Sequence, residues 1–502
     1  IYGSVTATSG DISISGDAVE VVGQLVTWAK DYSESIDGVA TKIEKLDYSN
    51  NDATTPGLVS DVFDPDKHLT TIADNTSLEV TSGESGSISI TSENDLDLLY
   101  GTVGNGLIQS AGGLTLKANN SGSIFVDTML DIGGNLSLTS GGEMLLDFSN
   151  IGSNNEFFHR DFLDHFKDHD SDTDHRITVS GNGEFIIALD MWDESNSKFD
   201  LAQYDVSNDD DWEGAEPHEL SDDISSLNLF VNSTEEKEKE GAKNYTSIWI
   251  SSAEQLNAIN EYKEGDSDSG ILGYNFALKN DINGRELETI DKDGNTLYAF
   301  KSIGGDEGFS GTFNGRDYRI IGLTVSAGTV ESNAGLFTQI KKGGTVKNLH
   351  IYASDFYGVD TAGAVAGKNS GVIDNVTTLG NYVVATGSGA SQEVVPVKLG
   401  AAGGIAGVNQ GTISDVTVAD AVVAQADNEE QDFVRVTAGG VTGINQGSIS
   451  QVNVLSAVTA SQAENSYGLG GVAGLNISGA SIAGAVNTGV THARYGNTIT
   501  AS

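Results

Sequence analysis

The stretch Ala402-Gly-Gly-Ile-Ala-Gly407, followed two residues later by Asn409, sets the pattern for the last third of this chain. Three further stretches repeat this glycine-rich core and keep an asparagine at the same offset: Ala362–Gly367 with Asn369, Ala438–Gly443 with Asn445, and Leu469–Gly474 with Asn476. The asparagines follow one another in steps of 40, 36 and 31 residues. Self-similarity with a period of about 20–50 residues is typical of solenoids and repeat arrays.

Short alternating segments follow these cores, such as Ile413-Ser-Asp-Val-Thr-Val418 and Ile449-Ser-Gln-Val-Asn-Val454. Alternation of apolar and polar residues predicts strands with one buried face. Such short strands cannot enclose a core alone and must stack on copies of themselves. Helical periodicity is missing from these repeats, so the pattern predicts an all-β solenoid, a β-helix in which each unit forms one or two coils.

The small residues of the cores suit this architecture. A segment such as Ala402–Gly407 carries little side chain, so the backbone can turn tightly and neighbouring coils can approach closely. Asn369, Asn409, Asn445 and Asn476 allow two interpretations. Asparagine tolerates tight turns and bonds to its own backbone, and in a stack it can also form an amide ladder with the next coil. Both interpretations are structural, and neither is catalytic.

The pattern Gly-Gly-[Ile/Val]-x-Gly-x-Asn-x-Gly-x-Ile resembles the GLUG repeat of bacterial surface proteins. Three upstream segments look like the lead-in of such arrays: Ile248–Ile259, Phe276–Ile282 and Ile303–Gly315. The resemblance covers roughly residues 248–490. It implies a cell-surface solenoid of the kind found in large secreted adhesins of the filamentous-haemagglutinin type and in some surface proteases, and it names no ligand.

Residues 76–150 also alternate, with glycines between the strands about every ten residues. Gly112-Gly-Leu-Thr-Leu116 and Gly133-Gly-Asn-Leu-Ser-Leu138 resemble the degenerate repeats of filamentous-haemagglutinin-like exoproteins from two-partner secretion. That resemblance implies a right-handed parallel β-helix. It adds weight to the solenoid interpretation of residues 248–502.

The charge of the chain is strongly unbalanced. Among 502 residues, 72 are acidic and 26 are basic, which gives a formal net charge of −46. Nucleic-acid binding requires a basic surface, so DNA and RNA are not expected partners, and anionic membranes are disfavoured. An acidic surface fits solubility in a salty medium, and it also fits divalent cations or basic patches on other proteins.

The chain has no cysteine, which excludes disulfides and thiolate metal sites. It contains no run of about 18 apolar residues that would span a bilayer. It starts at Ile1 without a signal peptide, so we expect a mature product or an excised piece of a longer protein. The resemblance to surface adhesins implies a location outside the cell or on its surface.

The N-terminal segment, residues 1–75, is interpreted as a strand pair at 4–8 and 11–15, then a helical hairpin and a loop. Val19, Val22, Val26 and Ala29 lie at helical spacing. With Asp17 and Glu20 as a capping box, they predict a helix over 18–31, followed by a second over 34–47.

Residues 151–247 are acidic and rich in histidine, and we interpret them as an insertion outside the solenoid, with strands at 176–179 and 184–189. The solenoid resumes over 248–502. There Ser251 and Glu254 predict a capped helix near 252–262.

The insertion contains two candidate metal sites. Four histidines lie within residues 159–175, and His165 and His169 are four apart, which on a helix would place both on one face. Asp170, Asp172 and Asp174 have the alternate spacing of a Ca²⁺ loop. The EF-hand pattern is not met, because His175 stands where glycine is required. The histidines with their neighbouring carboxylates suit Zn²⁺ or a similar metal, and the aspartates suit Ca²⁺, the cofactor that we expect if any is bound. A solvated acidic loop explains the same residues.

Catalytic patterns are absent. The sequence holds no His-Glu-x-x-His, no Gly-x-Ser-x-Gly elbow with partners and no Gly-Lys-[Ser/Thr] after the glycine-rich cores. We therefore expect no enzymatic activity. The resemblance to filamentous-haemagglutinin-type exoproteins implies an adhesive protein that contacts a protein or glycan on a host or neighbouring cell. The alternatives are a self-assembling subunit of an extracellular filament and a β-helical polysaccharide-degrading enzyme.

Overall fold

The computed structural model describes the chain in segments: residues 2–7, 12–16, 19–27, 87–99, 107–110, 112–149, 162, 164–166, 175–199, 227–232, 242–260, 271–290, 296–298, 300–327, 332–387, 398–425, 434–461 and 468–494. It divides into two compact units. Unit 1 comprises residues 1–191 and 200–247, and unit 2 comprises residues 192–199 and 248–502. Each unit is a stack of parallel strands, so the prediction of a parallel β-helix is confirmed.

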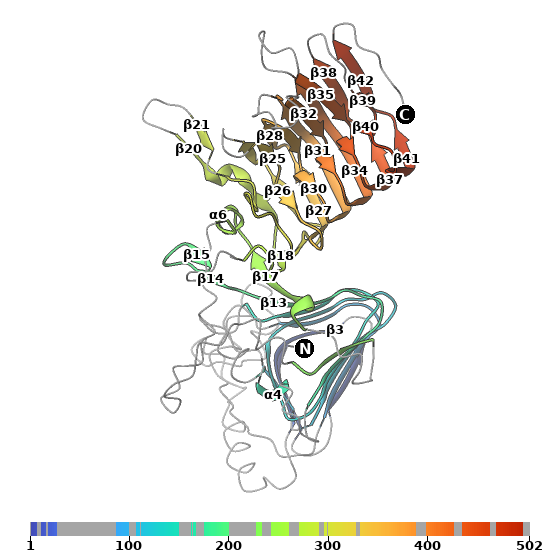
Figure 1. Cartoon of the computed structure of the whole chain (residues 1–502). Coiled ribbons are helices and arrows are strands. Elements are labelled where there is room, and N and C mark those ends of the chain that lie inside the picture. The colour runs from blue at the N-terminus through green and yellow to red at the C-terminus, as the bar shows by residue number, and fades with distance from the viewer. Residues whose placement is uncertain are drawn as a thin grey trace. The chain divides into compact units, whose positions relative to one another are not determined.

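Unit 1 consists of coils with three walls, which Figure 1 shows around a common interior. The first wall contains β2 (Ile12–Gly16), β4 (Ile88–Ser92), β7 (Leu114–Ala118), β10 (Leu136–Thr139), β12 (Ile177–Ser180) and β16 (Leu229–Val231). The second contains the first half of β3 (Val19–Thr27), then β5 (Leu96–Leu99), β8 (Ile124–Asp127), β11 (Met144–Asp147) and β13 (Phe185–Leu189). The third contains β1 (Tyr2–Ala7), the rest of β3, β6 (Leu107–Ser110) and β9 (Met129–Ile132).

Register and burial explain why these sequences stack. One column of the first wall is apolar in every coil whose side chains are described, and each member is 0% exposed: Ile88, Leu114, Leu136, Ile177 and Leu229. Burial of a side chain of this size stabilises by about 1.5–3 kcal/mol. A one-residue slip would turn the whole column outward, so the alternation fixes the register.

The predicted helix over residues 18–31 is wrong. Residues 19–27 form strand β3, which pairs in parallel with β1 on one side and with β5 and β6 on the other. The valines favour a strand because β-branched side chains fit a pleated surface, and the partners on both sides outweigh the helical spacing. The second predicted helix, over residues 34–47, lies outside the described residues.

Two further interpretations of this half change. The predicted strands near residues 4–8 and 11–15 exist, but they do not pair with each other, because β1 pairs with β3 and β2 with β4. The region 151–247 is not wholly outside the solenoid. Its strands β12, β13 and β16 extend the walls begun by β10 and β11. A short helix, α4 (Asp164–Phe166), and a 3₁₀ turn, η6 (Ala242–Tyr245), also belong to unit 1.

Unit 2 begins with less regular coils. They contain β17 (Thr246–Ile250), β18 (Phe276–Leu278), β19 (Ile282–Asn283), β22 (Thr312–Asn314), β23 (Arg319–Ile321) and β24 (Thr324–Ser326). Unit 2 also contains two antiparallel hairpins. The first joins β14 (Trp192–Asp193) to β15 (Lys198–Phe199), and the second joins β20 (Glu288–Ile290) to β21 (Thr296–Tyr298). A 3₁₀ turn, η7 (Gly284–Leu287), precedes β20. Helix α6 (Ala253–Ala258) starts at the N-cap Ser252, one residue later than the predicted cap Ser251, because the Ser252 hydroxyl accepts the N–H of Gln255.

The regular part of unit 2 repeats three elements in each coil, drawn side by side from yellow to red in Figure 1. The first sheet contains β25 (Asn333–Ala334), β29 (Thr361–Gly363), β32 (Lys398–Gly403), β35 (Val434–Gly439) and β39 (Gly468–Gly470). The second contains β26 (Phe337–Ile340), β30 (Ala366–Asn369), β33 (Ala406–Asn409), β36 (Thr442–Asn445) and β40 (Ala473–Asn476). The third, outer element contains β27 (Thr345–Tyr352), β28 (Asp355–Gly358), β31 (Val372–Ala385), β34 (Thr412–Gln425), β37 (Ser448–Val454), β38 (Ala457–Ser461), β41 (Ser481–Asn487) and β42 (Val490–Arg494).

The glycine-rich cores lie where the first sheet turns into the second. Gly363, Gly403, Gly439 and Gly470 pair in register and form a single column through four coils. On the outer element, Phe313, Val346, Ile373, Ile413 and Ile449 form the matching interior column, and all are 0% exposed. The repeats therefore share one continuous core.

Candidate functional site

The four repeat asparagines stack through their side chains. Asn369 Nδ2 donates to Asn409 Oδ1 at 2.9 Å, Asn409 Nδ2 to Asn445 Oδ1 at 2.9 Å, and Asn445 Nδ2 to Asn476 Oδ1 at 2.8 Å. The first three residues are 0% exposed, whereas Asn476 in the last described coil is exposed. This amide ladder runs along the end of the second sheet.

Each buried asparagine also bonds to its own turn. Asn409 Oδ1 accepts the N–H of Gly411 at 3.2 Å, two residues ahead, and Asn409 Nδ2 donates a second bond to the carbonyl of Ser448 at 3.3 Å. The turn interaction and the ladder, which the sequence left as alternatives, thus coexist in one side chain. No polar atom of Asn409 remains for a ligand, so the ladder serves stacking.

Close packing between the first two sheets explains the glycines of the cores. A Cβ atom built on Gly407 would lie 2.7 Å from Thr361 Cβ and 2.8 Å from the carbonyl oxygen of Ala401. A Cβ on Gly443 would meet the backbone of Ala402 at 2.8 Å. The sheets therefore approach to backbone contact, a distance that admits only glycine.

Two further ladders run beside the buried one and were not predicted. In the first, Asn375 Nδ2 donates to Asn348 Oδ1 and Asn348 Nδ2 to Asn314 Oδ1. In the second, Ser370 Oγ donates to Gln410 Oε1 and Gln410 Nε2 to Gln446 Oε1. The first ladder lies on a bend with positive φ in successive coils, at Asn348, Asn375, Asp415, Gln451 and Gly484. The backbone is thus left-handed at the same position of successive coils, and the sequence alone indicates this only weakly.

A buried polar column lies at the second bend of the long outer strands, where the register shifts between Leu379 and Tyr382. Ser354, Asn381, Asp420 and Ser456 follow one another in four coils. Burial raises the pKa of the Asp420 carboxyl to about 6, although contacts with Thr378 and Asn381 act in the opposite direction.

The proposed Ca²⁺ residues Asp170, Asp172 and Asp174 lie outside the described residues, as does His169. His165 and His175 are described, and their rings stack with centroids 4.4 Å apart. His165 Nε2 lies 3.1 Å from the carbonyl oxygen of Gly134, and burial lowers the pKa of this histidine. Within the described segments, no group of three His, Cys, Asp or Glu residues is arranged to hold a metal ion.

The outward face of unit 2 carries exposed apolar side chains. The described large hydrophobic residues with high exposure all lie between β28 and β42: Tyr357, Val372, Leu379, Tyr382, Leu455, Leu475, Ile477, Val486 and Val490. Leu379 is 49% exposed and Leu455 50% exposed, and both lie at the corner after the second strand segment of the coil. Nearby, the rings of Tyr357 and Tyr382 meet edge to face at 6.0 Å. We call the residues Tyr357, Leu379, Tyr382 and Leu455 the apolar corner.

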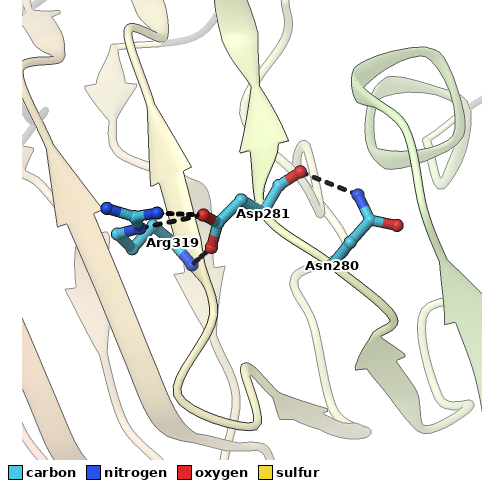
Figure 2. Close-up of polar contacts among 3 residues, drawn as sticks. All are labelled: Asn280, Asp281 and Arg319. Carbon is cyan, nitrogen blue, oxygen red and sulfur yellow. Dashed lines mark hydrogen bonds and ion pairs between the residues drawn. The ribbon is translucent and has the colours of Figure 1, made fainter.

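An ion pair joins two of the earlier coils of unit 2. Figure 2 shows Arg319 on β23 paired with Asp281 of the preceding coil, whose side chain receives the Arg319 guanidinium and backbone N–H. The side-chain hydrogen bond from Arg319 lowers the pKa of Asp281. Asn280 Nδ2 donates to the carbonyl of Asp281 at 2.7 Å. Both partners of the ion pair are exposed, so it joins two coils at the surface and forms no enclosed site.

Comparison with known proteins gives two partial similarities. No model of a protein family matches the chain. Over 135 residues the sequence is 31% identical to halomucin of Haloquadratum walsbyi, and this match spans 26% of the chain and 1% of the length of halomucin. A solved structure from Bacteroides ovatus, described as a "putative immunoglobulin A1 protease", is 22% identical with a TM-score of 0.35, over 47% of this chain and 63% of that one. Neither similarity covers enough of both proteins to assign a family.

The described residues include no helix that is long and apolar enough to cross a membrane.

Proposed function

We propose that this chain is part of an extracellular adhesive protein, in which the β-solenoid of unit 2 is a rigid support that presents the apolar corner to another surface. The observation that carries this proposal is the exposure of large apolar side chains on an outward face of a chain whose formal net charge is −46. Exposed apolar patches on soluble proteins mark interaction sites.

Three further features support the proposal. The buried amide ladder and the continuous core make the support stiff, and a stiff support positions surface residues well. The local similarity to halomucin favours a secreted or surface location. Tyr357 and Tyr382 offer ring surfaces to a protein or a glycan, because tyrosine combines an apolar face with a hydroxyl group.

The test measures retention of the full chain on surfaces coated with neutral glycans, with protein extracts of cell envelopes or with whole cells. Leu379→Glu and Leu455→Glu place a charge in the apolar corner, and we expect about a tenfold loss of retention for each, because a buried unpaired charge opposes contact. The control Gln410→Glu adds the same charge at an exposed ladder position of the neighbouring coil. Equal losses in all three variants, or none in the leucine variants, would refute the proposal.

Self-assembly is a second candidate, because the last described coil exposes Leu475, Val486 and Val490. Sedimentation of the same samples over a range of concentrations separates the two. Assembly that grows with concentration and is unaffected by Leu379→Glu would favour a filament subunit over adhesion through the apolar corner.

A further inference from the structure

A line of small polar side chains crosses the interior of unit 2 at the second bend of the outer strands. Ser354 N donates to Asn381 Oδ1 at 2.9 Å, and both Asn381 N and Asn381 Nδ2 donate to Asp420 Oδ1 at 3.0 Å. Asp420 N in turn donates to Ser456 Oγ at 3.2 Å. All four residues are at most 3% exposed, so this buried column links four successive coils.

Asp420 is the one ionisable member of this column, and half of its carboxyl group is unpaired. Asp420 Oδ1 accepts two N–H groups, whereas Asp420 Oδ2 has no hydrogen-bond partner although the residue is only 3% exposed. Thr378 Oγ1, on the neighbouring strand β31, is also buried, and its contact with the Asp420 carboxyl favours the ionised form. A carboxylate that is buried without a cation is costly, and the hydrogen bonds that Asp420 accepts offset this cost only in part.

The surroundings of the carboxyl group are uncharged among the described residues. Thr378 and Asn381 face it from β31, Ser456 faces it from the following coil, and a Cβ atom on Gly404, in the turn after β32, would lie 3.4 Å from Asp420 Oδ2. Asp415, on the same strand, is exposed. No cation among these groups compensates the charge of an ionised Asp420, and burial raises the pKa of this carboxyl to about 6.

We propose that Asp420 makes the contact between neighbouring coils dependent on pH, because protonation of its carboxyl group stabilises this contact. When a proton from solvent binds to Asp420 Oδ2, the carboxyl group becomes neutral, and its O–H can donate to Thr378 Oγ1. When the proton leaves, the Thr378 hydroxyl can donate to the carboxylate instead, but the interior then holds a negative charge that no cation compensates, and the contact between β31 and β34 weakens.

The direction of the pH effect follows from the two protonation states. The ordinary pKa of the group is 3.8 and that in the folded chain is about 6, so the folded state binds the proton more tightly than the unfolded state does. The stabilisation is complete below about pH 4 and is lost as the pH rises through about 6. Two pKa units correspond to a change of about 100-fold in the unfolding equilibrium.

The test compares the full chain with Asp420→Asn, a neutral group of the same shape whose amide can donate to Thr378. We expect the ratio of the unfolding constants of wild type and variant to rise by about 100-fold between pH 4 and pH 7. The matched control, Asp415→Asn, removes the same charge from an exposed position of strand β34, and its ratio should change much less. A ratio for Asp420→Asn that is constant over this range, or that matches the control, would overturn the proposal.

A second measurement needs no variant. Hydrogen exchange of the wild-type chain, corrected for the intrinsic effect of pH, should show lower protection of residues 376–385 and 416–424 at pH 8 than at pH 5, relative to the ladder strands β30 and β33. Equal protection at both pH values would contradict stabilisation of the coil contact by protonation of Asp420, even if Asp420→Asn failed to fold.

Discussion

At the scale of single residues, the solenoid depends on side chains that make several contacts at once. Asn409 closes its own turn through Gly411, accepts from Asn369 and donates to Asn445. Because it is completely buried, each group left without a partner would cost about 1–3 kcal/mol. Substitution of a buried ladder asparagine should therefore cost more stability than substitution of an ordinary turn asparagine.

We expect Asn409→Ala to lower the free energy of unfolding by roughly 3 kcal/mol, because it unpairs groups in two neighbouring coils and in its own turn. Denaturant unfolding followed by circular dichroism measures the change. Gln410→Ala is the matched control, because Gln410 belongs to an exposed ladder in the same coils. Its effect should stay below about 0.5 kcal/mol. Similar losses in both variants would show that burial does not set the strength of the ladder.

At the scale of elements, the sequence predicted the repeat and its register but not every strand. Each glycine-rich core keeps its asparagine at one offset, so the elements on either side of the turn could be predicted together. The prediction for residues 19–27 was wrong because their valines fit helical and strand spacing alike. Only the pairing with β1, β5 and β6 decides between helix and strand.

The buried polar column could not be predicted for a different reason. Its members are Ser354, Asn381, Asp420 and Ser456, so no two successive coils carry the same residue type there. The register of β31 and β34 also shifts just before Asn381, between Leu379 and Tyr382, which changes the spacing from one coil to the next. Columns of unlike residues with unequal spacing become visible only when the coils are superimposed in space.

The contact between the first two sheets of unit 2 leads to a prediction about elements. Gly407→Ala should lower the free energy of unfolding by at least about 2 kcal/mol, because the added methyl group would overlap the strands that hold Thr361 and Ala401. Gly273→Ala is the control, since a Cβ there would have only Ser310 Oγ nearby, at 3.5 Å. Thermal unfolding of both variants measures the difference. If Gly407→Ala were as stable as the control, the sheets would not be in backbone contact.

At the scale of the whole molecule, charge opposes compactness. A formal net charge of −46 makes the folded chain repel itself, and added salt screens this repulsion. We expect the midpoint of thermal unfolding to rise as KCl is increased from about 0.1 M to 1 M, where the screening length falls from about 10 Å to about 3 Å. NaCl at equal concentrations should act alike, because screening does not depend on the cation. A falling midpoint, or a rise with one salt alone, would indicate another cause.

The repeat asparagines are separated by 40, 36 and 31 residues, yet their ladder bonds differ by no more than 0.1 Å. The first two sheets keep their register in the same coils. Apart from the one-residue shift between Leu379 and Tyr382, the differences in length therefore fall in the stretches between the end of one long outer strand and the start of the next coil, after Ala385, Gln425 and Ser461. Duplication of one unit in a gene would therefore deliver a coil that already fits its neighbours. Mutations that lengthen or shorten a connecting stretch would leave the spine unchanged, so these stretches can diversify during evolution while the support that carries them is conserved.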